Sequence, residues 1–274
     1  MDRRFQPAVP THHYLASPAG RTHAVDLGGG PRPALVFLSG LGSCAAGYHH
    51  LLRELAGQRR VIGLDRFGSG LSDGLRVSGH PRSTWVEQVV AVVSRLGLGQ
   101  VDLVGHSLGG MVAAAAAIDC PGLVRRLVLI APLGVGRNHP WTWAPAMVPG
   151  ATDIAAALAW RAVNPNSDAD REGWDPCQLA AGRWWGAADL DSVGRLITPR
   201  GYRRATTLLP DLGLLHDRTL ILWGDRDGQV PLAPARDALA AYPALRLEVL
   251  PGAGHLAPLE RPVEVAAAVR RWLD

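Results

Sequence analysis

The chain has 274 residues, of which 47% are hydrophobic, so it is long enough and apolar enough to bury a sizeable core. All of its basic residues are arginines, which give a formal net charge of +4 and stand singly or in pairs, not in clusters with aromatic residues. No apolar run reaches membrane-spanning length, so we expect a protein that binds neither nucleic acid nor membrane.

The cysteines and the N-terminal sequence predict a reducing, cytoplasmic location. Cys44, Cys120 and Cys177 are odd in number, widely separated and without C-x-x-C spacing, which is typical of reduced thiols and not of a disulfide framework or a zinc site. Arg3 and Arg4 are followed by polar, proline-containing sequence and not by the apolar run of an export signal.

Short apolar runs alternate with helical patterns along most of the chain. Residues 14–16 and 23–26 predict a hairpin of two edge strands, and the continuous run at 34–38 predicts a strand buried on both faces of a parallel sheet. Further strands are expected at 60–64, 101–104, 127–130, 219–223 and 245–250, and helices at 48–56, 83–96, 111–118, 232–242 and 262–273. This alternation indicates an α/β protein whose mostly parallel sheet is flanked by helices.

The pattern changes in residues 133–210. Strand signals are lost there, six of the nine tryptophans occur there, and short helices are expected near 153–163, 176–185, 189–197 and 201–209. The strands resume afterwards. We therefore expect a helical cap inserted into one core that is made of residues 1–132 and 211–274.

The stretch from Gly105 to Gly109 has the pattern G-x-S-x-G between a predicted strand and a predicted helix. In that context the serine, Ser107, stands on a sharp, strained turn with its hydroxyl exposed at the end of the strand. Glycines two residues to either side avoid collisions with the neighbouring strand and helix. The motif predicts a nucleophile.

A serine nucleophile needs a base within hydrogen-bond reach and a carboxylate that orients the base. Of the ten histidines, His255 follows the last strand on a glycine-rich loop that can reach over the sheet. Asp225 and Asp227 follow the strand at 219–223, at the strand end where α/β sheets bind ligands. Either aspartate fits the order Ser, Asp, His.

Taken together, these motifs resemble those of the α/β-hydrolase-fold enzymes, and the resemblance covers essentially the whole chain. The acid of that family usually lies in the pattern G-x-x-D-x-x-x-P, which favours Asp227 over Asp225. The remaining matches are Gly224 and Pro231 around the acid, Gly254-His255, and Asp65, Gly68, Gly70 and Ser72 in a D-x-x-G-x-G-x-S loop that we interpret as structural. The resemblance implies that the helical insertion is the family's cap.

An oxyanion hole needs two backbone N–H groups aimed at the developing negative charge. One is expected from Leu108, at the start of the helix after the nucleophile. By register with the family, the second comes from Leu41. Family members commonly have His-Gly in that loop, whereas this chain has Ser39-Gly40, so Ser39 or Ser43 is predicted to line the pocket, and Tyr48 to face it.

The rest of the substrate pocket is predicted from position alone. His106, beside the nucleophile, and Leu256, beside the base, are candidate substrate contacts. Trp141, Trp143 and Trp184 in the cap either roof an apolar acyl or ring pocket or hold the cap onto the core.

These residues predict a serine hydrolase for an ester, thioester or lactone with a largely apolar body. Ser107 excludes the dehalogenase and epoxide-hydrolase chemistry that the resemblance would imply for an aspartate there. No metal or organic cofactor is expected, the partner is a small molecule, and the chain is a monomer or a homodimer. One alternative is acyl transfer, cyclisation or carbon–carbon hydrolysis by the same triad, although Leu256 stands where carbon–carbon hydrolases often have an aromatic residue. Another is a receptor without catalysis.

Overall fold

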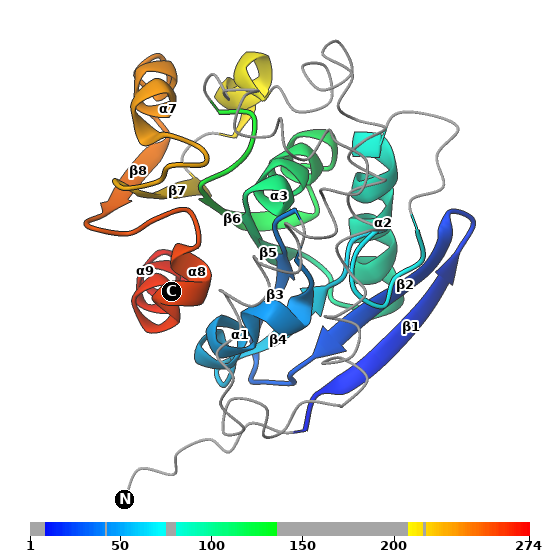
Figure 1. Ribbon diagram of the computed structural model, residues 1–274. Coiled ribbons are helices and arrows are strands. Elements are labelled where there is room, and N and C mark those ends of the chain that lie inside the picture. The colour runs from blue at the N-terminus through cyan, green and yellow to red at the C-terminus, as the bar shows by residue number, and fades with distance from the viewer. Residues whose placement is uncertain (1–8, 42, 75–80, 136–207, 216–217) are drawn as a thin grey trace, which may run out of the picture.

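One eight-stranded sheet organises the computed structural model, which describes residues 9–41, 43–74, 81–135, 208–215 and 218–274. The strand order is β1-β2-β4-β3-β5-β6-β7-β8 (Figure 1). The strands are β1 (Thr11–Ser17), β2 (Gly20–Asp26), β3 (Arg32–Leu38), β4 (Arg59–Leu64), β5 (Val101–His106), β6 (Val124–Ile130), β7 (Thr219–Gly224) and β8 (Arg246–Leu250). β1 and β2 pair antiparallel, β2 pairs antiparallel with β4, and the pairings from β4 to β8 are parallel.

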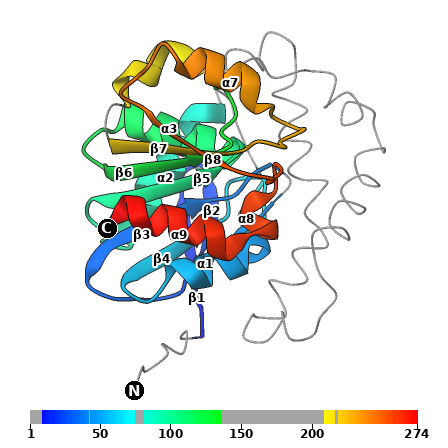
Figure 2. The ribbon, with the colours of Figure 1, turned by 90° about the vertical axis from the view of Figure 1, so that its left-hand side faces the viewer.

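Helices cover both faces of the sheet (Figure 1, Figure 2). One face packs against α2, α3 and α7, and the opposite face packs against α1, α8 and α9. The described helices are the 3₁₀ turn η1 (Ala45–Tyr48), α1 (His49–Leu55), α2 (Pro81–Arg95), α3 (Leu108–Asp119), the 3₁₀ turn η4 (Leu209–Leu214), α7 (Leu232–Leu239), α8 (Ala257–Glu260) and α9 (Pro262–Leu273). The expected mostly parallel α/β architecture is confirmed.

Strand β3 illustrates why a continuous apolar run becomes a central strand. Successive side chains of a strand point to opposite faces of the sheet. Leu35 and Phe37 accordingly join the core under α1 and α9, whereas Val36 and Leu38 join the core under α2 and α3. All four are fully buried, so a polar residue at any of them would lose its contact with water.

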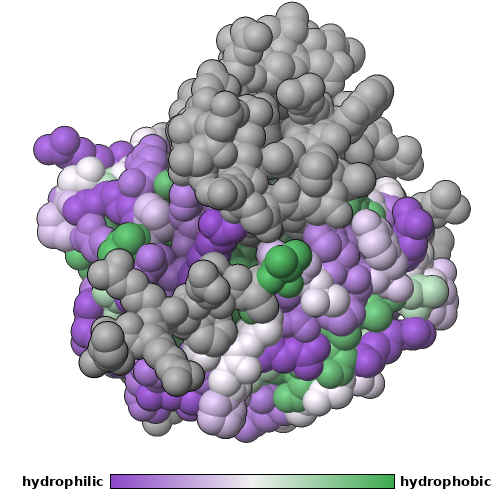
Figure 3. Space-filling model, turned by 90° about the horizontal axis from the view of Figure 1, so that it is seen from below, coloured by the Kyte–Doolittle hydropathy of each residue, from purple (hydrophilic) through white to green (hydrophobic). Residues whose placement is uncertain are grey.

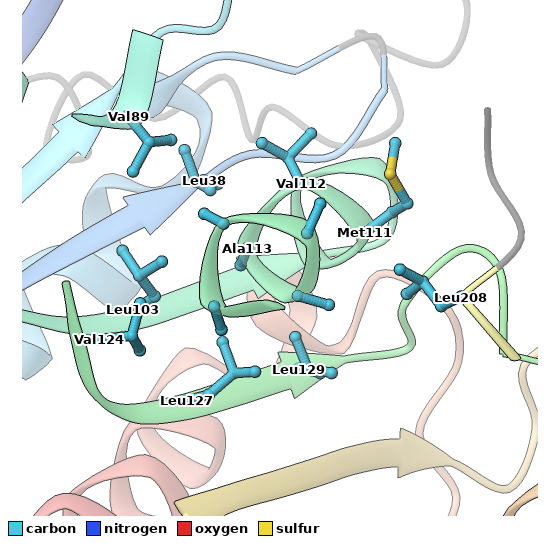
Figure 4. Packing of buried hydrophobic residues seen from close by; sticks show 14 of the residues in the cluster. Leu38, Val89, Leu103, Met111, Val112, Ala113, Val124, Leu127, Leu129 and Leu208 are labelled. Carbon is cyan, nitrogen blue, oxygen red and sulfur yellow. The ribbon is translucent and has the colours of Figure 1, made fainter. Parts of the chain in front are cut away.

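Helix α3, which begins directly after Ser107, lies close to the sheet because its side chains are small. Its residues from Leu108 to Ala117 are all buried. Figure 4 shows this helix over the strands, where it packs among side chains from β3, β5 and β6 that include Leu38, Leu103, Leu127 and Leu129. The packing fixes the start of α3 relative to the carboxyl ends of the strands.

The element predictions hold with small shifts at the ends. The helix expected at 232–242 ends at Leu239, and the short helices α8 and η4 were not predicted. Four to six residues are too few to show helical periodicity, so these elements leave no signal in the sequence. The helices expected between 133 and 210, apart from the last residues of that span, lie outside the described residues, so the predicted cap stays a prediction.

Two hydrogen bonds form what we call the neck, which joins the residues after β6 to the turn at Ser107 and to the residue before η4. The Leu133 N–H donates to the Ser107 carbonyl at 3.0 Å, and the Leu208 N–H donates to the Gly134 carbonyl at 3.1 Å. The neck therefore holds Leu133 against the turn at Ser107 and holds Leu208 beside Gly134.

Figure 3 shows a face of the molecule on which hydrophobic residues are scattered among hydrophilic ones. In the described part of the chain, the large hydrophobic side chains that are exposed are Val9, Tyr14, Leu214 and Val263, which come from separate segments. No helix in that part is long and apolar enough to cross a membrane.

Candidate active site

Ser107 occupies a strained turn between β5 and α3. Its φ of 52° and ψ of −116° lie in a region that residues with a Cβ atom rarely adopt. The conformation is held on both sides of the residue: the Ser107 N–H donates to the Ile130 carbonyl at 2.9 Å, and the Ser107 carbonyl accepts from Met111 at 3.1 Å. The surrounding core therefore enforces the strain that presents the hydroxyl.

The two glycines of the motif are required by backbone contacts. A Cβ atom on Gly105 would lie 2.3 Å from the Gly109 carbonyl oxygen, and one on Gly109 would lie 2.2 Å from the Leu38 carbonyl oxygen. Both distances are far shorter than any non-bonded contact allows. The motif is thus explained by how closely the turn, the helix and β3 approach one another.

His255 lies between Ser107 and Asp227. Its Nε2 is 3.1 Å from Oγ of Ser107, and its Nδ1 is 2.7 Å from Oδ2 of Asp227. An ionised carboxylate only accepts hydrogen bonds, so Nδ1 carries the proton and Nε2 presents its lone pair to the serine hydroxyl. The other oxygen of Asp227 accepts the backbone N–H groups of Gln229 and Val230 at 2.9 Å and 2.8 Å, which fix the carboxylate.

The three side chains lie at the ends of three different strands. Ser107 follows β5, Asp227 follows β7 and His255 follows β8, and all three residues are at least 90% buried, with exposures of 3%, 6% and 7%. Parallel strands end at one edge of the sheet, which brings residues distant in sequence together. The low exposure strengthens the electrostatic contacts among them.

Asp225, the alternative acid, points elsewhere. It is exposed, and its Oδ1 accepts the Gly252 N–H at 2.7 Å, so it ties the loop after β7 to the loop after β8. Asp227 alone of the pair contacts His255 in the described structure.

The candidate oxyanion donors come from adjacent strands. Leu108 is the first residue of α3, where N–H groups lack an acceptor within the helix and the helix dipole is positive. Leu41 follows β3, which pairs with β5 in a register that sets Leu38 opposite Gly105. The loop after β3 and the nucleophile turn thus leave the same edge of the sheet.

A buried arginine holds the loop after β3. Arg66 donates from Nε to the Ser39 carbonyl at 3.1 Å and from Nη2 to the Gly40 carbonyl at 2.8 Å, and its guanidinium lies over the Trp85 ring. A trans peptide is planar, so holding the Gly40 carbonyl also fixes the Leu41 N–H, which points the opposite way. No pattern of residue types indicates this role, because an arginine after Asp65 is expected on the surface.

Three side chains that we predicted to contact substrate are engaged within the protein. The Ser39 hydroxyl donates to the Ser43 carbonyl at 2.7 Å, and the Tyr48 hydroxyl lies 2.7 Å from Nδ1 of His106. All three are buried, at 0%, 1% and 2% exposure. Each of these side chains thus has a hydrogen-bond partner within the protein, and its contact with substrate stays a prediction.

Burial dominates the titration of two of these groups. Burial raises the pKa of the Tyr48 hydroxyl to about 12. Burial, together with the charge of nearby His255, holds the pKa of His106 well below its usual range. Tyr48 therefore keeps its proton and His106 stays neutral around pH 7.

The remaining predicted contacts are only partly described. Leu256 is half-buried and directly precedes α8, beside the base. Trp141, Trp143 and Trp184 lie outside the described residues, as does Cys177, whereas Cys44 and Cys120 are reduced thiols. Within the described ranges, no three His, Cys, Asp or Glu side chains gather as a metal site would need.

Comparison with known proteins assigns the family. The model of the alpha/beta hydrolase family matches residues 35–268. An uncharacterized protein of Mycobacterium tuberculosis is 27% identical over 89% of this chain and 76% of its own length. A 2-hydroxymuconate semialdehyde hydrolase from a Pseudomonas species is 38% identical over 46% of this chain and 47% of its own.

A solved structure shows the same fold over nearly the whole chain. The crystal structure of the carboxylesterase CesB from Bacillus subtilis superposes with a TM-score of 0.74 and 24% identity, over 97% of this chain and 92% of that one. The match of the family model to most of the chain, with the sheet and the serine turn described above, shows that the protein belongs to the alpha/beta hydrolase family.

Proposed function

We propose that the protein is a serine hydrolase that cleaves an ester, thioester or lactone through an acyl-enzyme. The observation that carries this proposal is the alignment of three groups, in which Nε2 of His255 lies 3.1 Å from the Ser107 hydroxyl and Asp227 holds the opposite ring nitrogen. In an α/β-hydrolase fold, a serine with this base is suited to attack a carbonyl.

In the proposed reaction, Oγ of Ser107 attacks the carbonyl carbon while Nε2 of His255 takes the hydroxyl proton. The imidazolium then returns that proton to the leaving alcohol or thiol, and water hydrolyses the acyl-enzyme by the same route. Asp227 orients the ring and stabilises its positive charge. The backbone N–H groups of Leu41 and Leu108 donate hydrogen bonds to the oxyanion.

An apolar acyl group is favoured by the neighbours of the oxyanion loop. Leu41 packs against the core cluster that includes Leu133 and Leu208 of the neck, and Leu256 is half-buried beside the base. Hydrophobic lining with few polar groups is the usual composition of a pocket for small apolar ligands. A charged acyl chain would have to leave water there without a partner.

Hydrolysis of a carbon–carbon bond is the second candidate. It is favoured by one observation, the 38% identity of almost half the chain to a 2-hydroxymuconate semialdehyde hydrolase. Against it stands Leu256 at the position directly after the base, where an aromatic residue is common in enzymes of that kind.

The test combines covalent labelling with turnover. A fluorophosphonate probe should label the wild-type protein and Ser107→Ala should abolish both labelling and hydrolysis of 4-nitrophenyl butyrate. Ser94→Ala, at an exposed position of α2, is the matched control and should behave like the wild type. Ester hydrolysis by Ser107→Ala within about tenfold of the wild-type rate would contradict the mechanism, since losing a nucleophile removes far more than this.

A substrate panel separates the two candidates. Nitrophenyl esters of increasing chain length, a thioester, a lactone and 2-hydroxymuconate semialdehyde are supplied to the labelled enzyme. Turnover of the esters, rising with the length of the acyl chain, supports the first candidate. Labelling of Ser107 with turnover of the semialdehyde alone supports the second.

A further inference from the structure

A continuous chain of hydrogen bonds connects the oxyanion loop with the loop of the base. The Gly40 N–H donates to the Tyr48 hydroxyl oxygen at 3.2 Å, that hydroxyl lies 2.7 Å from Nδ1 of His106, and Nε2 of His106 lies 2.8 Å from the carbonyl oxygen of His255. We call these three contacts the bridge. The atoms come from the loop after β3, from η1, from β5 and from the loop after β8.

The direction of each bond in the bridge follows from its two ends. A backbone N–H can only donate, so the Tyr48 oxygen accepts from Gly40. A carbonyl can only accept, so Nε2 of His106 carries a proton and donates it in a hydrogen bond to the backbone carbonyl of His255. A neutral imidazole then has its lone pair on Nδ1, which accepts the proton of the Tyr48 hydroxyl. All donors point the same way, and such chains polarise and strengthen one another.

His106 has to be neutral for the bridge to exist. An imidazolium would turn a second N–H toward the Tyr48 oxygen and leave the phenolic proton facing a donor. His106 is buried, and its ring centroid lies 4.8 Å from that of His255, so a positive charge on His106 would also oppose the imidazolium that His255 forms during catalysis. The surroundings thus select the one protonation state that completes the chain.

Gly40 lets the oxyanion loop reach the bridge. A Cβ atom on Gly40 would lie 3.0 Å from Nδ1 of His106 and 3.2 Å from the Tyr48 hydroxyl, which is closer than almost all real contacts. The N–H of Gly40 is bound to Tyr48, and its carbonyl is bound to Arg66. The peptide that carries the Leu41 N–H is therefore held at its near end by the bridge and at its carbonyl by the arginine.

From this arrangement we propose that Tyr48 and His106 are positioning residues, which set the oxyanion loop at a fixed distance from His255. The inference rests on the proposed function, since it gives the bridge a role in serine catalysis. In the described structure, the hydrogen bonds of the bridge do not involve the Ser107 hydroxyl or the ring nitrogens of His255. Tyr48 acts through the backbone N–H of Gly40, and His106 acts through the backbone carbonyl of His255. The oxyanion loop, which contains Gly40, lacks the histidine common in the family.

The test uses two variants that break the bridge at different places. Tyr48→Phe keeps the ring, which packs against Phe37 at 4.7 Å between centroids, and deletes only the hydroxyl. His106→Gln keeps an amide N–H near Nε2 for the His255 carbonyl and loses the acceptor for Tyr48. Tyr14→Phe on the exposed strand β1 is the matched control.

The bridge predicts a specific kinetic pattern with 4-nitrophenyl butyrate. Tyr48→Phe and His106→Gln should each lower kcat and the rate of fluorophosphonate labelling by about tenfold, with KM within about twofold, because they disturb alignment and not ground-state binding. The kcat of the double variant should lie within about twofold of the kcat of either single variant, because both changes break the same chain of hydrogen bonds. Tyr14→Phe should match the wild type.

Three results would overturn the proposal. The first is a raised KM with unchanged kcat, which would make the side chains substrate contacts. The second is a lowered melting temperature with unchanged kcat and labelling rate, which would leave them a purely structural role. The third is a double variant whose losses multiply, which would make the two residues independent.

Nitrogen-15 NMR of the histidine-labelled protein tests the bridge without turnover. His106 should be the neutral Nε2–H tautomer, and Tyr48→Phe should shift its Nδ1 resonance by removing a hydrogen bond, while Tyr14→Phe leaves it unchanged. The Nδ1–H tautomer would refute the bridge even in an active enzyme. If the wild type neither reacts with the probe nor cleaves esters, the proposed function fails, and with it the positioning role, whereas the tautomer still reports whether the bridge is present.

Discussion

Oδ2 of Asp227 lies 2.7 Å from Nδ1 of His255, while Asp225, two residues earlier on the same loop, faces solvent and accepts the Gly252 N–H. The two aspartates have the same side chain but different partners, so the same substitution at each separates the role of the acid from that of a loop contact. Asp227→Asn should lower kcat for 4-nitrophenyl butyrate by roughly 10⁴-fold, because an amide favours the wrong tautomer of the histidine. Asp225→Asn should stay within about threefold of the wild type, since the carboxylate there only ties two loops. Equal losses in both variants would contradict this assignment.

A methyl group at Gly105 should unfold the nucleophile turn. Because its Cβ would lie 2.3 Å from the Gly109 carbonyl oxygen, Gly105→Ala should lower the free energy of unfolding by about 3 kcal/mol or more. Gly122→Ala is the control, because nothing lies within 4 Å of its Cβ, and it should change stability by less than about 0.5 kcal/mol. Urea unfolding measures both variants, and a Gly105→Ala protein as stable as Gly122→Ala would show that the turn can relax.

Replacement of Arg66 by lysine should lower kcat by about tenfold, because an ammonium cannot reproduce the forked contacts with two carbonyl oxygens. The contacts at 3.1 Å and 2.8 Å hold the Ser39 and Gly40 carbonyls, and so the Leu41 N–H. Arg82→Lys, whose guanidinium contacts Asp119 at an exposed site, serves as the control. Steady-state kinetics should show a fall in kcat in Arg66→Lys alone, and unaltered kinetics would remove Arg66 from the oxyanion loop.

Acid should destabilise the protein through His106. Burial lowers the pKa of His106 in the folded state, so below the ordinary value of 6.5 the unfolded chain binds a proton that the folded chain does not. The stability due to neutral His106 is complete above pH 6.5 and is lost as the pH falls toward the folded pKa, by up to about 1.4 kcal/mol per pH unit.

Comparison of the wild type with His106→Gln isolates this contribution. Urea unfolding between pH 7.5 and pH 5 lies above the range in which Asp26 and Asp274 titrate, because the pKa of each is already lowered from 3.8. The difference in stability between the two proteins should shrink as the pH falls. A difference that stays constant over this range would mean that His106 binds its proton equally well in the folded and unfolded states, which would contradict the lowered pKa.

The strands of the sheet could be predicted from the sequence because each strand is marked by a short apolar run of neighbouring residues. The run at 34–38 is apolar at every position, which only a strand buried on both faces explains, and the structure places it in β3. The short helix α8 was missed because four residues carry no period. The choice of Asp227 over Asp225 needed the spacing known from the family, since both follow the same strand.

The supports of the site could not be predicted, for a physical reason. Arg66, Tyr48 and His106 act through backbone atoms of residues 8 to 149 positions away, and any backbone atom can serve as a partner whatever its side chain. Such contacts leave no pattern of residue types in the sequence. Ser39 is a further example, because its hydroxyl donates to the backbone carbonyl of Ser43, a contact that no residue pattern indicates.

The neck has a consequence for how this protein could acquire new substrates. Because the Leu208 N–H is bound to the Gly134 carbonyl, the two residues that flank the intervening sequence lie side by side. Insertions and exchanges are best tolerated where both ends meet in this way. Exchange of the sequence between Gly134 and Leu208 for that of a relative should therefore leave the described strands able to fold, and it offers one route by which substrate preference could change.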